Sequence, residues 1–146
     1  KPQNILILPE TGEVRVMDFG ISRVSDVQAD SGLTTEGTVL GTPDYMPPEQ
    51  AQGKPADFRS DVYSMGVVLF EIFTGRLPFN AENPMAQVLK HIQTPPPAPR
   101  RYNTQIPEGL ERVVLLCMEK DPEQRYQRVS ELLSVLEAVS SRLETA

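Results

Sequence analysis

The sequence predicts a mainly α-helical fold with a small β-hairpin at its N-terminus. Two short apolar runs flank a turn within the first twenty residues, a long apolar segment follows near residues 60–74, and amphipathic segments fill the second half. The chain has 146 residues, of which 39% are hydrophobic, so it is the size of one domain and can build one core.

The first twenty residues predict the hairpin. Residues 5–8 are an apolar run, residues 9–12 carry the Pro and Gly of a turn, and residues 14–17 alternate between apolar and other side chains. The two strands are therefore antiparallel, and their outer ends lie side by side.

The register of this hairpin decides which polar groups meet. We expect Leu6 to face Val16, which places Asn4 opposite Asp18 at about 5 Å between Cβ atoms. An amide and a carboxylate are hard oxygen ligands that suit Mg²⁺, and the ammonium of Lys1 can neutralise phosphate. This constellation indicates a bound nucleotide.

Residues 22–38 predict a surface loop with little intrinsic order. The segment is rich in Ser, Thr, Asp and Gly and shows no periodicity. It carries six hydroxyl side chains: Ser22, Ser25, Ser31, Thr34, Thr35 and Thr38.

A helix from Ser60 or Asp61 to about Thr74 is predicted at the centre of the fold. Either of the first two residues can cap it, and Gly75 can stop it. Its apolar residues leave almost no polar face, which is typical of a helix surrounded by protein. They are Val62, Met65, Val67, Val68, Leu69, Phe70, Ile72 and Phe73.

Three amphipathic helices are predicted after this one, each with an apolar inner face at helical spacing. The first begins at Pro84 and buries Met85, Val88, Leu89 and Ile92. The second begins at Pro107 and buries Leu110, Val113, Val114 and Cys117. The last runs from about Val129 to Leu143 and buries Val129, Leu132, Leu133, Leu136 and Leu143. The single His91 is predicted at the surface.

Composition excludes several classes of function. Fourteen basic against twenty acidic residues give a net charge of -6, which argues against a nucleic-acid partner. One Cys and one His leave no internal disulfide and no zinc site of Cys and His, so a reducing cytoplasm fits best. The longest apolar run is far shorter than the roughly 20 residues of a membrane span, so any membrane anchor of a longer protein would lie outside this segment.

Four motifs resemble the C-terminal lobe of serine/threonine protein kinases, in particular of bacterial members. They are KPQN at residues 1–4, MDFG at 17–20, GTPDYMPPE at 41–49 and DVYSMG at 61–66. Their order and spacing agree with the family, because the DFG triplet begins fourteen residues after Asn4. The KPxN form together with Thr42 points to serine or threonine as the phosphate acceptor.

The resemblance implies roles for the motif residues. Asp18 would chelate the Mg²⁺ that bridges the β- and γ-phosphates of ATP, and Asn4 would hold a second ion. Lys1 would steady the γ-phosphate, and Leu6 would form an apolar floor under the adenine. Thr42 would hydrogen-bond the catalytic aspartate and lysine.

Three further residues are implied to support the site. Glu49 would close the activation segment and form an ion pair with Arg125. Asp61 has two readings that both stay open: it caps a helix, or it receives backbone amides of the catalytic loop.

The resemblance also places the hydroxyl-rich loop in the activation segment. Phosphorylation there can order a mobile segment by giving an arginine a dianion to pair with. The candidate phosphosites are Thr34, Thr35 and Thr38, although hydroxyls are also common in ordinary loops.

In kinases KPxN follows the HRD triplet of the catalytic loop, so we expect the chain to begin just after the catalytic aspartate. Residues 1–146 would then form a partial kinase domain, with the Gly-rich loop, the strand lysine and its glutamate partner upstream. We expect the fragment alone to be inactive, because the base and half of the phosphate clamp would be absent.

The main functional hypothesis is ATP- and Mg²⁺-dependent transfer of the γ-phosphoryl group to Ser and Thr hydroxyls of protein substrates. One alternative is a pseudokinase-like interaction module that binds partners or dimerises through the region of kinase helix G. Another is nucleotide binding without protein phosphorylation. The presence of Lys1, Asn4 and Asp18 favours the kinase.

Overall fold

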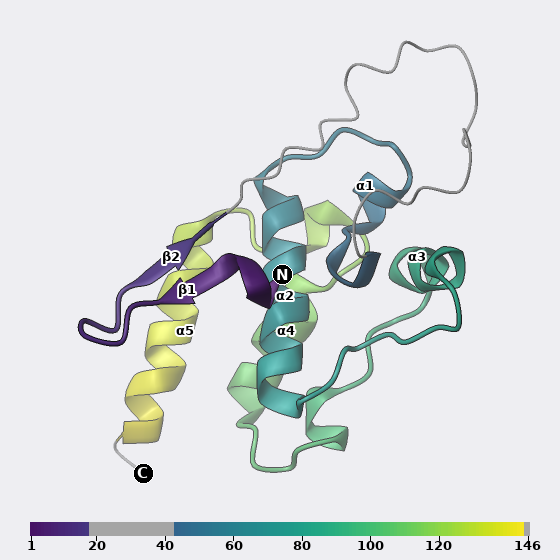
Figure 1. The fold of residues 1–146 in the computed structure, drawn as a ribbon. Helices are drawn as coiled ribbons and strands as arrows, with labels where there is room; N and C mark the ends of the chain where they lie inside the picture. The colour runs from purple at the N-terminus through teal and green to yellow at the C-terminus, as the bar shows by residue number, and fades with distance from the viewer. Residues whose placement is uncertain (18–42, 145–146) are drawn as a thin grey trace. The chain divides into compact units, whose positions relative to one another are not determined.

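The chain is divided into two compact units, residues 1–42 and 43–146. The computed structural model describes residues 1–17 of the first unit and 43–144 of the second, with side chains up to residue 142. Each unit is described by itself (Figure 1).

The described part of the first unit is a β-hairpin, as predicted. A short 3-10 turn, η1 (Pro2–Asn4), leads into strand β1 (Ile5–Ile7), which pairs antiparallel with β2 (Val14–Val16). In the connecting turn the Gly12 amide donates to the Leu8 carbonyl at 2.8 Å, and the Leu8 amide donates to the Glu13 carbonyl at 2.9 Å. Gly12 has a φ of 70°, a left-handed conformation that glycine adopts without strain.

The predicted register of the hairpin is wrong by one residue. Leu6 pairs with Arg15 instead of Val16, and the Met17 amide donates to the Asn4 carbonyl at 2.7 Å. The turn causes the difference, because left-handed Gly12 lets Glu13 close the loop one residue earlier than expected. A one-residue slip exchanges the two faces of a strand, so Asn4 lies opposite Met17. Asp18 lies outside the described residues.

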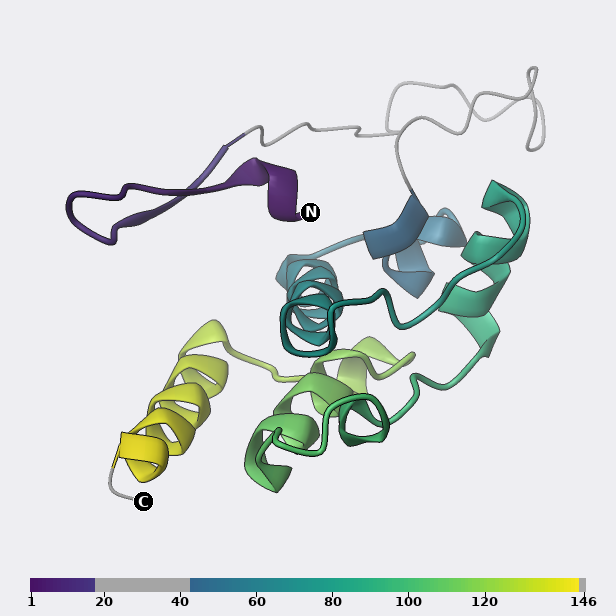
Figure 2. The same ribbon diagram turned by 60° about the horizontal axis from the view of Figure 1, so that its bottom comes forward.

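The second unit is helical. After the 3-10 turn η2 (Pro43–Tyr45), its α-helices are α1 (Pro48–Ala51), α2 (Phe58–Thr74), α3 (Pro84–Gln93), α4 (Glu108–Cys117) and α5 (Val129–Glu144). Two more 3-10 turns, η3 (Pro99–Arg101) and η4 (Pro122–Gln124), lie before and after α4. Helix α2 lies between the η2–α1 segment and α4, and α5 packs on α4 (Figure 2). The mainly helical class with one small hairpin is confirmed.

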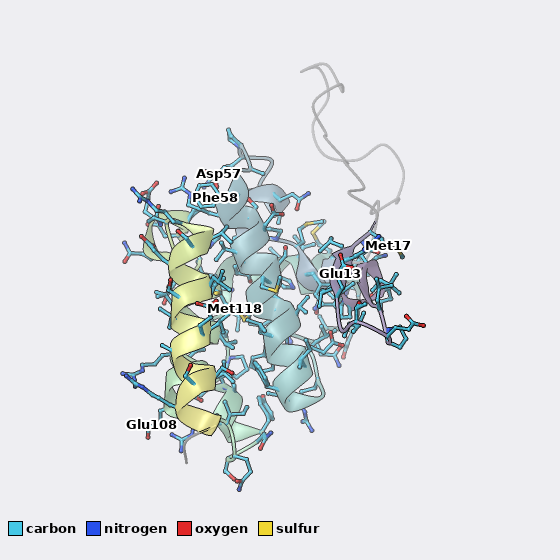
Figure 3. The ribbon with its side chains drawn as sticks, turned by 90° about the vertical axis from the view of Figure 1, so that its left-hand side faces the viewer. Glu13, Met17, Asp57, Phe58, Glu108 and Met118 are labelled. Atoms are coloured by element: carbon cyan, nitrogen blue, oxygen red, sulfur yellow. The ribbon has the colours of Figure 1, made fainter. Side chains whose placement is uncertain are left out.

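Helix α2 spans almost the predicted range but begins earlier. Its N-cap is Asp57, whose side chain accepts a hydrogen bond from the Arg59 amide at 2.8 Å, so the predicted caps Ser60 and Asp61 are wrong. Figure 3 shows Asp57 and Phe58 at this end of the helix. Gly75 ends it with a φ of 72°, as predicted.

The core forms around the buried face of α2. One cluster joins Tyr63, Val67 and Phe70 to Phe79, Val114 and Met118, and a second joins Val62 to Val113, Cys117 and Leu132. The α2 and α4 backbones approach closely at Gly66, where an added Cβ would lie 2.7 Å from Cys117 Cβ. The prediction that α2 is surrounded on all sides is not met within residues 43–144, because Met65 and Ile72 are 40% and 63% exposed.

Helix α3 begins at Pro84 as predicted, but its predicted inner face is only half correct, because Val88 and Ile92 are partly buried whereas Met85 and Leu89 are exposed. Asn83 caps it through the Ala86 amide at 2.9 Å. The structure buries Gln87 and His91 and leaves Met85 and Leu89 on the exposed side. These two polar side chains point inward because they have hydrogen-bond partners outside the helix, the Phe79 carbonyl and the Tyr63 hydroxyl. Helical periodicity does not reveal such partners.

The last two helices are also confirmed as elements. All four predicted inner residues of α4 are buried, and its N-cap is Pro107. On α5, Leu132 is buried and Leu136 is partly buried, whereas Val129 and Leu133 are exposed, so the predicted apolar face is too wide. None of the helices in residues 1–17 and 43–144 is long and apolar enough to cross a membrane.

Candidate functional site

The hairpin carries the described part of the predicted phosphate and metal site. Asn4 is half-buried just before β1. Its backbone amide donates to the Lys1 carbonyl at 3.0 Å, and its backbone carbonyl accepts from the Met17 amide. Both backbone groups of Asn4 are thus fixed, which restricts where its side-chain amide can point. Lys1 is exposed, and Leu6 is 41% exposed on β1.

The donor set predicted for Mg²⁺ is Asn4 and Asp18. In the described residues no group of three or more His, Cys, Asp and Glu side chains is arranged to hold a metal ion. The amide oxygen of Asn4 is a hard donor on a fixed backbone and therefore fits Mg²⁺. The remaining predicted site residues, Asp18, Thr42 and the phosphosites Thr34, Thr35 and Thr38, lie outside the described residues.

A buried ion pair joins the end of the predicted activation segment to the chain before α5. Arg125 donates to both carboxylate oxygens of Glu49 at 2.8 Å, and Ser60 of α2 donates to one of them at 2.6 Å. Burial opposes ionisation of Glu49, but the hydrogen bonds from Arg125 and Ser60 outweigh it and lower the pKa of the carboxyl. The contact expected between Glu49 and Arg125 is present.

Arg125 also forms hydrogen bonds with backbone carbonyls and lies over an aromatic ring. Its remaining hydrogen bonds go to backbone carbonyls of Arg59, Glu119 and Lys120, and its guanidinium lies 4.9 Å from the ring centroid of Tyr63. The charge is therefore satisfied although the side chain is fully buried, so this residue holds two further segments of chain, at Arg59 and at residues 119–120, close to Glu49.

The turn η2 is attached to α2 by two more hydrogen bonds. The Tyr45 hydroxyl donates to Glu71 at 2.6 Å, and the Ser64 hydroxyl donates to the Tyr45 carbonyl at 2.8 Å. Burial and the neighbouring Glu71 carboxylate raise the pKa of Asp44, and burial with the same hydrogen bond raises that of Tyr45. The residues that directly follow Thr42 in the sequence are thus held against the central helix.

Asp61 lies in the first turn of α2 with an exposed side chain. Its reading as the helix cap is wrong, because Asp57 has that role. Its reading as an acceptor for catalytic-loop amides stays a prediction.

The structure contains a polar cluster that sequence reasoning missed. His91 was predicted at the surface but is fully buried, with Nδ1 3.0 Å from the Tyr63 hydroxyl. Lys120 donates to the His91 carbonyl at 2.7 Å and lies 3.3 Å from the same hydroxyl. Burial lowers the pKa of His91 to about 4 and that of Lys120 to about 8, each with a further lowering by a neighbouring cation. The available signal was the spacing of Gln87 and His91, four residues apart on one helix face.

Comparison with known proteins identifies the family. The model of the protein kinase domain matches residues 1–136. The chain belongs to the protein kinase family, as its motifs predicted.

The relatives are bacterial serine/threonine kinases. The chain is 43% identical over 141 residues to a probable serine/threonine-protein kinase of Clostridium acetobutylicum, which covers 97% of this chain and 21% of that protein. It is 46% identical over 144 residues to a probable serine/threonine-protein kinase of Corynebacterium efficiens, with coverages of 96% and 22%. Serine/threonine-protein kinase PrkC of Bacillus subtilis is 39% identical over 132 residues, with coverages of 90% and 20%. The chain therefore spans about a fifth of the length of these curated relatives.

Proposed function

We propose that residues 1–146 are the part of a serine/threonine protein kinase domain that runs from the catalytic loop to the last helix. The protein containing them would transfer the γ-phosphoryl group of ATP to Ser and Thr hydroxyls of protein substrates. The observation that supports this most is the match to the kinase domain over residues 1–136, within which Lys1, Asn4 and Asp18 are all present.

The chemistry assigned to these residues is electrostatic. Phosphoryl transfer passes through a loose transition state, so positioning and charge neutralisation supply most of the acceleration. Asn4 and Asp18 would hold Mg²⁺, which neutralises charge on the phosphates when bound. Lys1 would contact the γ-phosphate, and Leu6 would lie under the adenine.

The second unit would hold the end of the activation segment. The Glu49–Arg125 pair and the Tyr45–Glu71 hydrogen bond fix the residues that follow Thr42. From the match to the kinase domain, Thr42 would contact the catalytic loop and Asp61 would receive its backbone amides. Phosphorylation of Thr34, Thr35 or Thr38 would regulate this segment.

A partner-binding role for α3 is a second proposal. Met85 and Leu89 are 52% and 44% exposed in the described unit and lie one turn apart on the helix. An apolar strip of this kind would serve docking or dimerisation in the region of helix G.

We place the kinase portion in the cytoplasm, where ATP and protein substrates are available.

The test uses the full-length gene product that contains this chain. It is incubated with Mg²⁺, ATP labelled at the γ-phosphate and a general protein substrate. We expect Asp18→Asn and Asn4→Ala to lower kcat, the former by about 100-fold or more, because metal coordination supplies several kcal/mol of charge stabilisation. Glu13→Gln removes an exposed ion pair with Arg15 on the same hairpin and is the matched control.

Three results would contradict the proposal. Wild-type protein that binds partners but transfers no phosphate would favour the interaction module. ATP hydrolysis without labelled protein would favour nucleotide binding alone. Unchanged phosphorylation by Asp18→Asn would remove the assigned metal site.

A further inference from the structure

Helix α3 packs with a polar face inward although it has an apolar alternative. Gln87 and His91 are 4% and 0% exposed, whereas Met85 and Leu89 are 52% and 44% exposed. The hydrophobic effect alone favours the opposite orientation. Positions where a chain departs from local rules of this kind are often functional.

The hydrogen bonds around His91 have a defined direction. The Lys120 ammonium can only donate, so at 3.3 Å it donates to the Tyr63 oxygen. The single hydroxyl hydrogen of Tyr63 is then free to go to His91 Nδ1, 3.0 Å away. In this arrangement Nδ1 accepts from Tyr63, and the neutral imidazole then carries its proton on Nε2.

The Nε2–H group of His91 is therefore a buried donor. Within the described residues, Nε2 is fully buried and has no partner with the geometry of a full hydrogen bond. Leaving such a donor unpaired is costly, and native structures rarely do so without a reason.

The backbone of Asp44 offers an acceptor to this donor. It acts on the His91 ring as a hydrogen-bond partner that raises the pKa of the imidazole, although no hydrogen bond of full geometry is formed, and α3 packs on η2, the turn that contains Asp44. This turn immediately follows Thr42 in the sequence. Catalytic-site hydrogen bonds in unliganded proteins are often long and tighten only in the complex.

We propose that His91 is a positioning residue for the kinase reaction, whose Nε2–H donates to the Asp44 backbone and thereby holds η2. This inference rests on the proposed kinase function. Lys120 and Tyr63 orient the imidazole. His91 thereby links α2 and α3 to η2, at the end of the activation segment. In this role it acts through the η2 backbone.

Two variants of the full-length protein with side chains similar in shape to histidine distinguish the role of Nε2 from that of Nδ1. His91→Gln places an amide N–H near the position of Nε2 and keeps the donor to Asp44. His91→Asn places an amide oxygen near Nδ1 and keeps only the acceptor for Tyr63. Gln93→Ala, on an exposed position of the same helix, is the matched control.

The first readout is kinetic, at a temperature where all variants are folded. We expect His91→Asn to lower kcat for a protein substrate by about tenfold, the effect of one lost hydrogen bond, with an unchanged KM for ATP. His91→Gln and the control should stay within about twofold of wild type, because the donor to η2 is kept or untouched.

The second readout does not need activity. The Met46 amide donates to the Pro43 carbonyl at 3.1 Å and so reports on the closure of η2. We expect its hydrogen exchange to be faster in His91→Asn and unchanged in His91→Gln.

The two hypotheses fail in different ways. Equal kcat and equal Met46 exchange in both His91 variants, in an active wild-type background, would overturn the positioning role. Wild-type protein without phosphoryl transfer would overturn the proposed function, while the exchange of Met46 would still test whether His91 holds η2.

Discussion

Arg125 and Glu49 are 76 residues apart in the sequence, yet the guanidinium donates to both carboxylate oxygens at 2.8 Å. The side chains are 0% and 7% exposed, so the pair is almost entirely removed from water. Ser60 adds a hydrogen bond from α2, which makes this the point where three distant segments are fixed together.

Glu49→Gln should destabilise the kinase domain by about 3 to 5 kcal/mol, because it leaves the Arg125 charge buried without a counter-charge. Chemical denaturation of wild type and variant measures the difference. The matched control is Glu123→Gln, which removes an exposed partner of Arg59 with 70% of its side chain accessible and should change stability little. Equal effects of the two substitutions would show that burial does not strengthen the first pair.

Gly66→Ala should destabilise the protein by about 1 to 3 kcal/mol through overpacking. The new Cβ would lie 2.7 Å from Cys117 Cβ and 2.8 Å from Met118 Cγ, so α2 and α4 would have to separate. Gly109→Ala is the control, because its Cβ would meet only the end of Val139 at 3.3 Å. That change should be neutral or stabilising by up to about 1 kcal/mol through helix propensity. A stabilised Gly66→Ala would contradict the close approach of the two helices.

Cys117 should be inert in the native protein. Burial raises the pKa of its thiol to about 12, and the side chain is 0% exposed, so neither thiolate nor access is available near neutral pH. We expect no alkylation of Cys117 by iodoacetamide at pH 7.5 in native protein and complete alkylation in denaturant, measured by mass spectrometry of its peptide. Rapid labelling of the folded protein would show that this part of the core opens.

Much of the helical unit could be predicted because its signals are local. Gly75 ends α2 and Pro84 begins α3, and the apolar spacing of α4 predicted the correct inner face. These features depend on residues within a turn or two of one another. They are readable without knowing what packs against them.

The errors arose where distant partners decide the outcome. His91 turns inward because Tyr63, 28 residues earlier, offers a hydroxyl, and periodicity carries no information on that. The hairpin register depends on the left-handed φ of Gly12, which moved the partner of Asn4 by one residue. In the second unit, the motifs predicted the Glu49–Arg125 pair, but only the fold shows the hydrogen bonds between η2 and α2.

Stability should fall as the pH decreases from about 7 to 5, because His91 is held neutral in the fold. Burial and Lys120 lower its pKa from 6.5 to about 4, so the unfolded chain binds more protons between these values and stability rises with pH there. The stabilisation is present above pH 6.5 and is lost progressively down to pH 4. The shift corresponds to a loss of about 2 kcal/mol between pH 7 and pH 5. Glu49, whose pKa is lowered from 4.5, affects stability only at lower pH.

Denaturation of wild type and His91→Gln at several pH values measures this effect. The stability advantage of wild type over the variant should shrink as the pH decreases through this window, since glutamine does not titrate. An NMR titration of the His91 ring gives the direct value, with an expected midpoint near pH 4. A midpoint near 6.5 would show that water reaches the ring. It would contradict the buried hydrogen-bond network of Lys120, Tyr63 and His91.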